Sequence, residues 1–250
     1  MNIIYRKMYS PSLGKDMEYK VYGSQGKPML VFPTSNGRFY QYEDFGMIEV
    51  LASFIESGQL QVWACDGLDW ETFLAQSKHP NDRIYRYNEY DQYIENELVP
   101  SILTESRQNN NGSEQKLIVS GCSMGAFHSA NFFFRHPENV DVLIALSGIY
   151  STRYFLGDYM DEQTYFHSPL DYLRNLQDEY YLKKFRQSKI IVCVGQGAYE
   201  GPMIEDTRCL QQILNDINVP AIVDFWGRDV NHDWNWWKKQ IKYYLQRIFG

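Results

Sequence analysis

The chain has 250 residues, enough for one large domain with a substantial core, and no internal repeat or long linker divides it. Its net charge of −7 and the absence of any lysine- or arginine-rich run argue against nucleic acid as a partner. No apolar run reaches the roughly 18 residues that a bilayer-spanning helix needs, so we expect no membrane partner.

Cysteine usage and the first residues of the chain predict a cytoplasmic protein. Residues 1–6 lack the apolar stretch and the small-residue cleavage site of a secretory signal peptide. Four cysteines are present, and they are Cys65, Cys122, Cys193 and Cys209. They form no C-x-x-C pair, and three of them lie in or beside apolar, strand-like runs. We therefore expect reduced thiols, as is usual in the cytoplasm.

Short apolar runs and amphipathic segments alternate along the whole chain. Residue alternation and apolar runs predict strands at 3–8, 15–22, 29–32, 62–65, 117–120, 142–146, 190–194 and 221–226. Helical spacing of apolar residues predicts helices at 45–56, 89–103, 126–135, 204–217 and 233–248. This order indicates an α/β protein whose mostly parallel sheet is flanked by helices on both faces. We expect residues 1–250 to form a single domain.

Residues 121–125 read Gly-Cys-Ser-Met-Gly, a G-x-S-x-G motif between a predicted strand and a predicted helix. In that setting the motif makes a sharp turn that exposes the serine oxygen. Ser123 is therefore the candidate nucleophile, and the alternative is a serine in a glycine-rich structural turn. Two antiparallel strands first and a serine elbow after the fifth strand together predict an α/β-hydrolase fold.

A serine hydroxyl needs a general base, and histidine is the usual one near pH 7. In this fold the histidine follows both the serine and the acid in the chain. Position disfavours four of the five histidines, namely His79, His128, His136 and His167. His232 follows the last predicted strand and is the candidate base. The alternative is a histidine that merely lies near the start of the final helix.

The acid should follow strand 190–194, where a carboxylate can orient the imidazole. Glu200 is the first carboxylate on that loop. Asp206 is the rival candidate, although it lies where a helix begins and could be an N-cap. Asp229 and Asp233 are close to the histidine in sequence and could belong to the start of the last helix.

An oxyanion hole needs two hydrogen-bond donors. We expect one to be the backbone N–H of Met124, which follows the nucleophile. The loop 33–37 should supply the other, from the N–H of Ser35 or from the side chain of Asn36. Substrate-binding candidates at the same edge of the sheet are Asn36, Asp66, Trp70 and Trp234.

The segment 150–187 is rich in aromatic residues, and we expect it to form a partial lid over the serine. Aromatic walls suit a carbohydrate or an aryl group as ligand. The alternative is that these rings simply anchor a long loop to the core.

With these residues in view, the chain resembles the esterase D group of α/β-hydrolases, which includes S-formylglutathione hydrolases, feruloyl and acetyl esterases, and mycolyltransferases. The similarity rests on the elbow 121–125, on residues 196–200 and on residues 229–234. It implies a triad of Ser123, Glu200 and His232, with Glu where the group usually has Asp. The chain departs from the group at Ala126, where Gly is usual, and in the loop 33–37, where the group usually has an HG or SG pair.

These observations predict a serine-dependent carboxylic ester hydrolase that acts through an acyl-enzyme on a small or medium acyl ester, such as an acylated carbohydrate or an aryl ester. Two alternatives stay open: an acyltransferase with the same triad, and a non-catalytic ligand-binding protein on a hydrolase scaffold. We expect no cofactor and no metal, since the chain contains no H-E-x-x-H, Walker or G-x-G-x-x-G motif. A homo-oligomer is compatible with the sequence.

Overall fold

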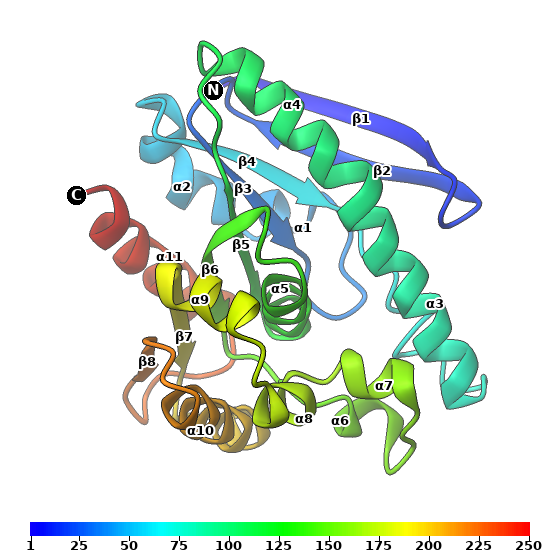
Figure 1. Cartoon of the computed structure of the whole chain (residues 1–250). Coiled ribbons are helices and arrows are strands. Elements are labelled where there is room, and N and C mark those ends of the chain that lie inside the picture. The colour runs from blue at the N-terminus through cyan, green and yellow to red at the C-terminus, as the bar shows by residue number, and fades with distance from the viewer.

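A computed structural model describes residues 1–250 and contains one eight-stranded sheet. The strand order across the sheet is β1-β2-β4-β3-β5-β6-β7-β8 (Figure 1). Only the pairs β1–β2 and β2–β4 are antiparallel, and every other pair is parallel. The strands are β1 (Ile3–Ser10), β2 (Lys15–Tyr22), β3 (Lys27–Phe32), β4 (Leu60–Cys65), β5 (Leu117–Cys122), β6 (Val140–Leu146), β7 (Lys189–Val194) and β8 (Ile222–Phe225). This topology confirms the predicted α/β-hydrolase fold.

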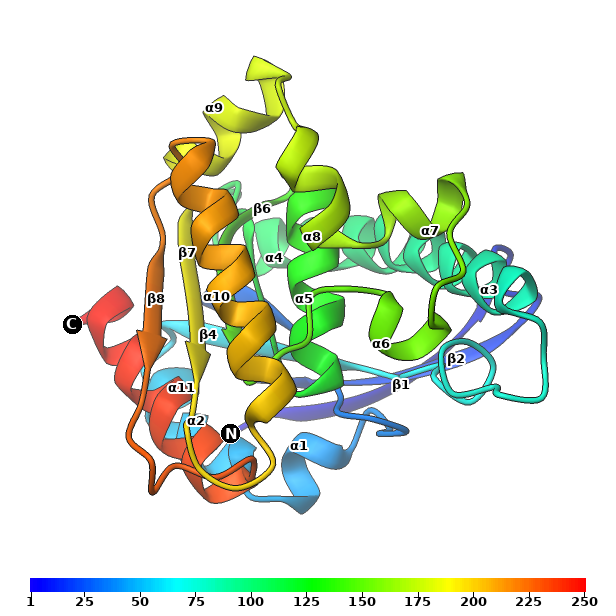
Figure 2. The ribbon, with the colours of Figure 1, turned by 90° about the horizontal axis from the view of Figure 1, so that it is seen from below.

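Helices cover both faces of the sheet, as predicted. They are α1 (Gln41–Asp44), α2 (Met47–Glu56), α3 (Pro80–Tyr93), α4 (Val99–Asn109), α5 (Met124–Arg135), α6 (Arg153–Leu156), α7 (Glu162–Phe166), α8 (Pro169–Tyr172), α9 (Glu179–Gln187), α10 (Gly201–Asp216) and α11 (Trp234–Phe249). Helices α2 and α11 pack side by side on one face (Figure 2). Helices α3, α4, α5, α9 and α10 bury their apolar sides in the cluster on the other face.

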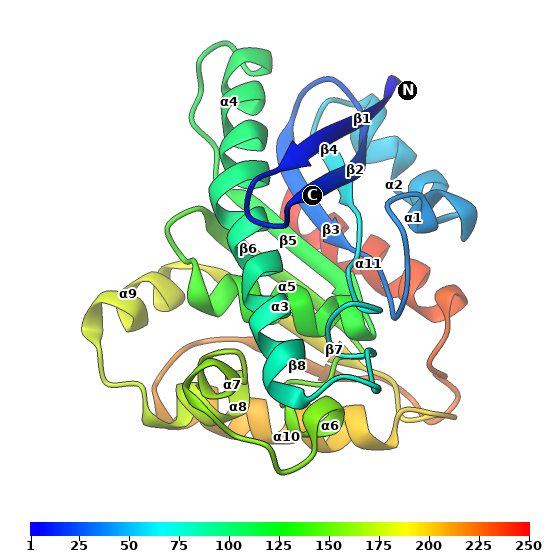
Figure 3. The ribbon, with the colours of Figure 1, turned by 90° about the vertical axis from the view of Figure 1, so that its right-hand side faces the viewer.

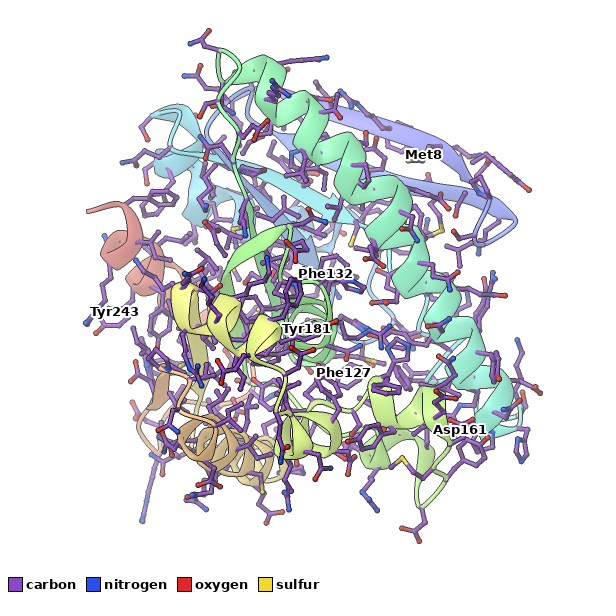
Figure 4. All side chains as sticks on the ribbon, in the orientation of Figure 1. Met8, Phe127, Phe132, Asp161, Tyr181 and Tyr243 are labelled. Atoms are coloured by element: carbon purple, nitrogen blue, oxygen red, sulfur yellow. The ribbon has the colours of Figure 1, made fainter.

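The larger apolar cluster is dominated by aromatic rings that α5 inserts beneath the sheet. Phe127 and Phe132 are fully buried there, whereas Tyr243 and Asp161 lie at the periphery of the molecule (Figure 4). Strands β4 and β5 are buried along their whole length, and β3, β6 and β7 are buried at all but one residue, which is why they appear in the sequence as apolar runs. The core therefore holds the carboxyl ends of β3, β5, β6 and β7 as a rigid edge.

The helix predicted at 89–103 is much longer than expected. It begins at Pro80, passes through a π-helical turn at Ile94–Leu98 and continues as α4, so that α3 and α4 form one long rod (Figure 3). Proline at the first helical position suits a helix start. The buried Arg83 then fixes this first part by donating hydrogen bonds to backbone carbonyls of the preceding coil and of Phe155. These partners are distant in sequence, so the apolar pattern alone does not reveal them.

No helix of the structure combines the length and the apolarity that crossing a bilayer requires.

Candidate active site

Strand β5 and helix α5 meet at Ser123 in a strained turn. Ser123 has φ 56° and ψ −122°, a backbone conformation that side-chain-bearing residues rarely adopt. The turn closes because its glycines leave room: a Cβ on Gly121 would lie 2.2 Å from the carbonyl carbon of Gly125, and one on Gly125 would lie 2.4 Å from the carbonyl oxygen of Phe32. The predicted nucleophile therefore sits on an elbow that is locked against the end of β3.

The loop after β8 brings His232 to the serine. Nε2 of His232 lies 2.8 Å from Oγ of Ser123, which is hydrogen-bond distance. Several hydrogen bonds tie this loop to the loop after β7. Among them, the backbone N–H of His232 donates to the carbonyl of Ala198, and the N–H of Ala198 donates to Oδ1 of Asn231. The position of the imidazole is thus set by the neighbouring loop and not by the final helix alone.

The loop after β7 places the carboxylate of Glu200 behind the imidazole. Oε2 of Glu200 lies 3.1 Å from Nδ1 of His232, and the side chain of Glu200 is fully buried. Its other oxygen accepts a 2.6 Å hydrogen bond from Oγ–H of Ser147, and that hydroxyl accepts one from Nε1–H of Trp237. Both carboxylate oxygens therefore have fixed donors, which holds the carboxylate in one orientation.

The rival acid, Asp206, lies elsewhere. It is inside α10 and is not the N-cap that the sequence suggested. Its carboxylate accepts hydrogen bonds from the backbone N–H groups of Tyr150 and Ser151, at 2.7 and 3.1 Å, and so anchors the start of the segment 150–187. The structure brings Glu200, and not Asp206, to His232. Asp233, as one reading of the sequence had it, caps the last helix.

Two backbone N–H groups beside Ser123 have no hydrogen-bond acceptor in the structure. One belongs to Met124, the first residue of α5, where a helix leaves its N–H groups free. The other belongs to Ser35. The neighbouring N–H groups of Thr34 and Asn36, in contrast, both donate to side-chain acceptors. Both residues line the same cavity as Ser123. The predicted oxyanion donors are therefore together and available.

The cavity at Ser123 has a volume of about 290 Å³ and is mostly apolar. It is lined by Ser35, Phe73, Leu74, Gln76, Ser123, Met124, Ile149, Tyr154, Phe155 and Met203. The segment 150–187 contributes Tyr154 and Phe155, and the ring of Phe155 packs against that of Phe73 at a centroid distance of 4.9 Å. Beyond these two residues, the segment packs on α3, α5 and α10 and does not line the cavity.

The four substrate-binding candidates lie outside the lining of this cavity. Asp66 is buried in an ion pair with Arg38 at 2.6 Å, and Arg38 also lies over the ring of Trp70. Trp234 stacks on Phe45 at a centroid distance of 4.8 Å. These three predicted residues therefore find their partners within the protein.

Asn36, the fourth candidate, has a left-handed backbone with φ 53°. Its backbone N–H is bound to Asp69, and no hydrogen bond fixes its side-chain amide. Ser35 lines the cavity at Ser123 and Asn36 does not, so the geometry favours the N–H of Ser35 over the side chain of Asn36 as the second oxyanion donor.

The sequence matches the model of a known protein family. The model of the Esterase family, described as "Putative esterase", matches residues 10–247. The chain belongs to the Esterase family. As the sequence analysis predicted, it is an enzyme that acts as a carboxylic ester hydrolase. No curated protein matches this esterase significantly in sequence.

Solved structures share the fold of this esterase at low sequence identity. A ferulic acid esterase superposes with a TM-score of 0.75 at 18% identity, over 100% of this chain and 98% of the other. An S-formylglutathione hydrolase from Agrobacterium tumefaciens gives 0.71 at 15%, over 99% and 98%. A ferulic acid esterase from Anaeromyces mucronatus gives 0.68 at 11%, over 98% and 89%. The resemblance predicted from the three motifs is thus confirmed.

A second histidine of the esterase, His136 at the end of α5, also contacts carboxylates. Its Nε2 lies 2.9 Å from Asp91 and its Nδ1 lies 2.8 Å from Glu95. Burial opposes the charged ring, but the hydrogen bonds that the ring donates to Asp91 and Glu95 outweigh it and raise the pKa of His136 to about 9. The ring is therefore protonated at neutral pH and offers no lone pair, although Asp91, Glu95 and His136 are close enough together to hold a metal ion.

The sequence analysis did not identify several residues of the site. Phe73, Leu74 and Gln76 lie in a coil after β4 that has no periodic pattern. Ser147 did carry a signal, because it follows the predicted strand 142–146 at the edge of the sheet where active sites lie. Trp237 resembled an ordinary apolar residue of the last helix, and nothing in the sequence distinguishes its indole N–H.

Proposed function

We propose that this esterase is a serine carboxylesterase that uses Ser123 as nucleophile, His232 as general base and Glu200 as the orienting acid. The observation that carries the proposal is the hydrogen-bonded path from Ser123 Oγ through the ring of His232 to Glu200, at 2.8 and 3.1 Å. A carboxylate at Nδ1 keeps the proton there, so Nε2 is left as the acceptor for the serine proton.

The reaction follows from this arrangement. Nε2 of His232 takes the proton of Ser123 while Oγ attacks the ester carbonyl, and the N–H groups of Ser35 and Met124 donate to the oxyanion that forms. The protonated imidazole then donates to the leaving alcohol, which leaves an acyl-enzyme on Ser123. Water attacks that ester by the same steps and releases the acid. Removing one oxyanion donor typically costs about 2.7–4 kcal/mol of transition-state stabilisation.

The cavity supports a small or medium apolar acyl group as the part of the ester that enters. Its volume is about 290 Å³, and most of its lining residues are apolar or aromatic. Apart from the two serines, the polar uncharged groups in the lining are the amide of Gln76 and the hydroxyl of Tyr154. The alcohol part of the substrate then faces the mouth of the cavity, where Tyr154 is exposed.

The first test is turnover of p-nitrophenyl acetate and butyrate by the wild type and by Ser123→Ala. We expect a burst of p-nitrophenol followed by steady turnover in the wild type, and loss of both in the variant by about 10⁴-fold or more. A thermal unfolding midpoint equal to that of the wild type would show that Ser123→Ala is folded. Equal turnover by the two proteins would refute the serine mechanism. A burst without steady turnover, relieved by added alcohols, would favour acyl transfer.

A further inference from the structure

A chain of buried polar side chains lies behind the oxyanion loop and takes no part in the proposed triad. Asp69, in the coil after β4, is 1% exposed, and His128, on α5, is 2% exposed. Oδ1 of Asp69 lies 3.0 Å from Nε2 of His128, and the hydroxyl of Tyr87, on α3, lies 3.0 Å from Nδ1 of the same ring. Asn131 and His167 continue the chain away from the site.

One end of this chain holds the oxyanion loop. Oδ2 of Asp69 accepts a 3.0 Å hydrogen bond from the backbone N–H of Asn36. Asn36 has φ 53°, a conformation that a residue other than glycine keeps only when its surroundings fix it. On the other side of Ser35, the N–H of Thr34 donates to Oε1 of Gln41 at 2.8 Å. The free N–H of Ser35 thus lies between two amides that side chains hold in place.

The direction of the hydrogen bonds fixes the tautomer of His128. Nδ2 of Asn131 donates to the hydroxyl oxygen of Tyr87, so the hydroxyl proton is directed at Nδ1 of His128. Burial, reinforced by the charge of Asp91, raises the pKa of Tyr87 well above its ordinary value, which keeps that proton on the hydroxyl. His128 then carries its own proton on Nε2 and donates it to Asp69. Both oxygens of Asp69 are therefore used, one by His128 and one by the oxyanion loop.

The same pair also connects the two oxyanion donors. His128 lies one helical turn after Met124 on α5, while Asp69 is bound to the loop that carries Ser35. In addition, the backbone carbonyl of Asp69 accepts the N–H of Leu74, which lines the cavity. Asp69 thus links the nucleophile helix and the oxyanion loop through its carboxylate, and one wall of the cavity through its backbone carbonyl.

We propose that Asp69, held by His128, is a positioning residue that aims the N–H of Ser35 at the developing oxyanion. The inference rests on the proposed serine mechanism. A shift of about 1 Å in a catalytic group can cost about 100-fold in rate, so a loosened loop should lower kcat more than it raises KM.

The test compares Asp69→Asn, His128→Gln and the matched control His167→Gln. Asparagine offers one acceptor in place of two, so either Asn36 or His128 faces an amide NH₂ group. We expect Asp69→Asn to lower kcat by about 10- to 100-fold and His128→Gln by about 3- to 10-fold, both with KM within about 3-fold. His167 is equally buried in the same chain and bonds Asn131 and Asn88, but it does not touch the oxyanion loop. His167→Gln should therefore lower the unfolding midpoint and keep kcat within about 3-fold.

An alkyl boronic acid, which forms a tetrahedral adduct on the serine, gives a readout that loss of stability alone would not change. We expect its inhibition constant to rise by about the same factor as kcat falls in Asp69→Asn and His128→Gln, and to stay unchanged in His167→Gln. If Asp69→Asn does not fold, the comparison of His128→Gln with His167→Gln still tests the inference. Wild-type kcat and boronate inhibition in folded Asp69→Asn or in folded His128→Gln would overturn the inference and leave the serine mechanism standing. If the turnover of the wild type does not depend on Ser123, both the serine mechanism and the role of Asp69 are refuted.

Discussion

His232 and His136 both lie against carboxylates, yet only His232 is arranged as a base. His232 has one carboxylate, Glu200 at Nδ1, and its Nε2 faces a serine hydroxyl. His136 has a carboxylate at each nitrogen, Asp91 and Glu95, and its pKa rises to about 9. One carboxylate therefore orients the ring of His232, whereas two carboxylates raise the pKa of His136 and favour its charged form.

The largest effect should come from removing the single carboxylate at His232. In Glu200→Gln, Ser147 continues to donate to the side-chain oxygen, so the new NH₂ group faces Nδ1 of His232. That favours the wrong tautomer, with the proton on Nε2, and we expect kcat to fall by about 10³- to 10⁴-fold. Steady-state hydrolysis of p-nitrophenyl esters measures it.

Asp206→Asn is the matched control, because the new side-chain oxygen still accepts the N–H groups of Tyr150 and Ser151. It should keep kcat within about 3-fold. Full activity in Glu200→Gln together with a large loss in Asp206→Asn would reverse the assignment of the acid.

His136 should matter for stability and not for turnover. The pKa of His136 in the folded protein, about 9, lies above the ordinary 6.5. The charged ring therefore stabilises the fold fully below about pH 6.5, and this stabilisation is lost as the pH rises through 9. The difference of about 2.5 units corresponds to about 3 kcal/mol. We expect His136→Gln to lower the free energy of unfolding by about that much at pH 6 and far less at pH 9.5, with kcat unchanged.

Urea unfolding at the two pH values measures this effect. A loss that is the same at pH 6 and pH 9.5 would mean that His136 contributes by packing and not by its charge.

The smallest effect should come from making His136 resemble His232. Glu95→Gln removes the more exposed of the two carboxylates and leaves Asp91 in place. We expect the pKa of His136 to fall by about one unit, since a nearby opposite charge is gone. Titration of the His136 ring protons by NMR follows it, with the wild type as reference. No change in the titration would show that Asp91 alone keeps the ring charged.

The elements that hold Ser123, Glu200 and His232 could be predicted because their signals are local. The strand before Ser123, the helix after it and the loops after β7 and β8 each follow from a short stretch of sequence. Ser123, Glu200 and His232 lie at the carboxyl ends of three different strands, and parallel strands bring those ends to one edge. Pattern and topology together were enough to place these residues near one another.

The cavity could not be predicted because its walls depend on contacts between distant segments. Trp70 and Trp234 were predicted to bind substrate, but they contact Arg38 and Phe45 and do not line the cavity at Ser123. The early start of α3 depends on bonds from Arg83 to carbonyls of other segments. Packing decides which partner a side chain contacts, and the spacing of residues along the chain does not predict that partner.

The indole of Trp237 gives this enzyme a built-in optical probe. Its ring meets that of His232 edge to face at a centroid distance of 4.8 Å, while its N–H is fixed by Ser147. A charged imidazolium accepts an electron from an excited indole more readily than a neutral ring does, so emission from Trp237 should dim whenever His232 carries a second proton. The part of the fluorescence that comes from Trp237, one of six tryptophans, should therefore follow the protonation of the proposed base His232.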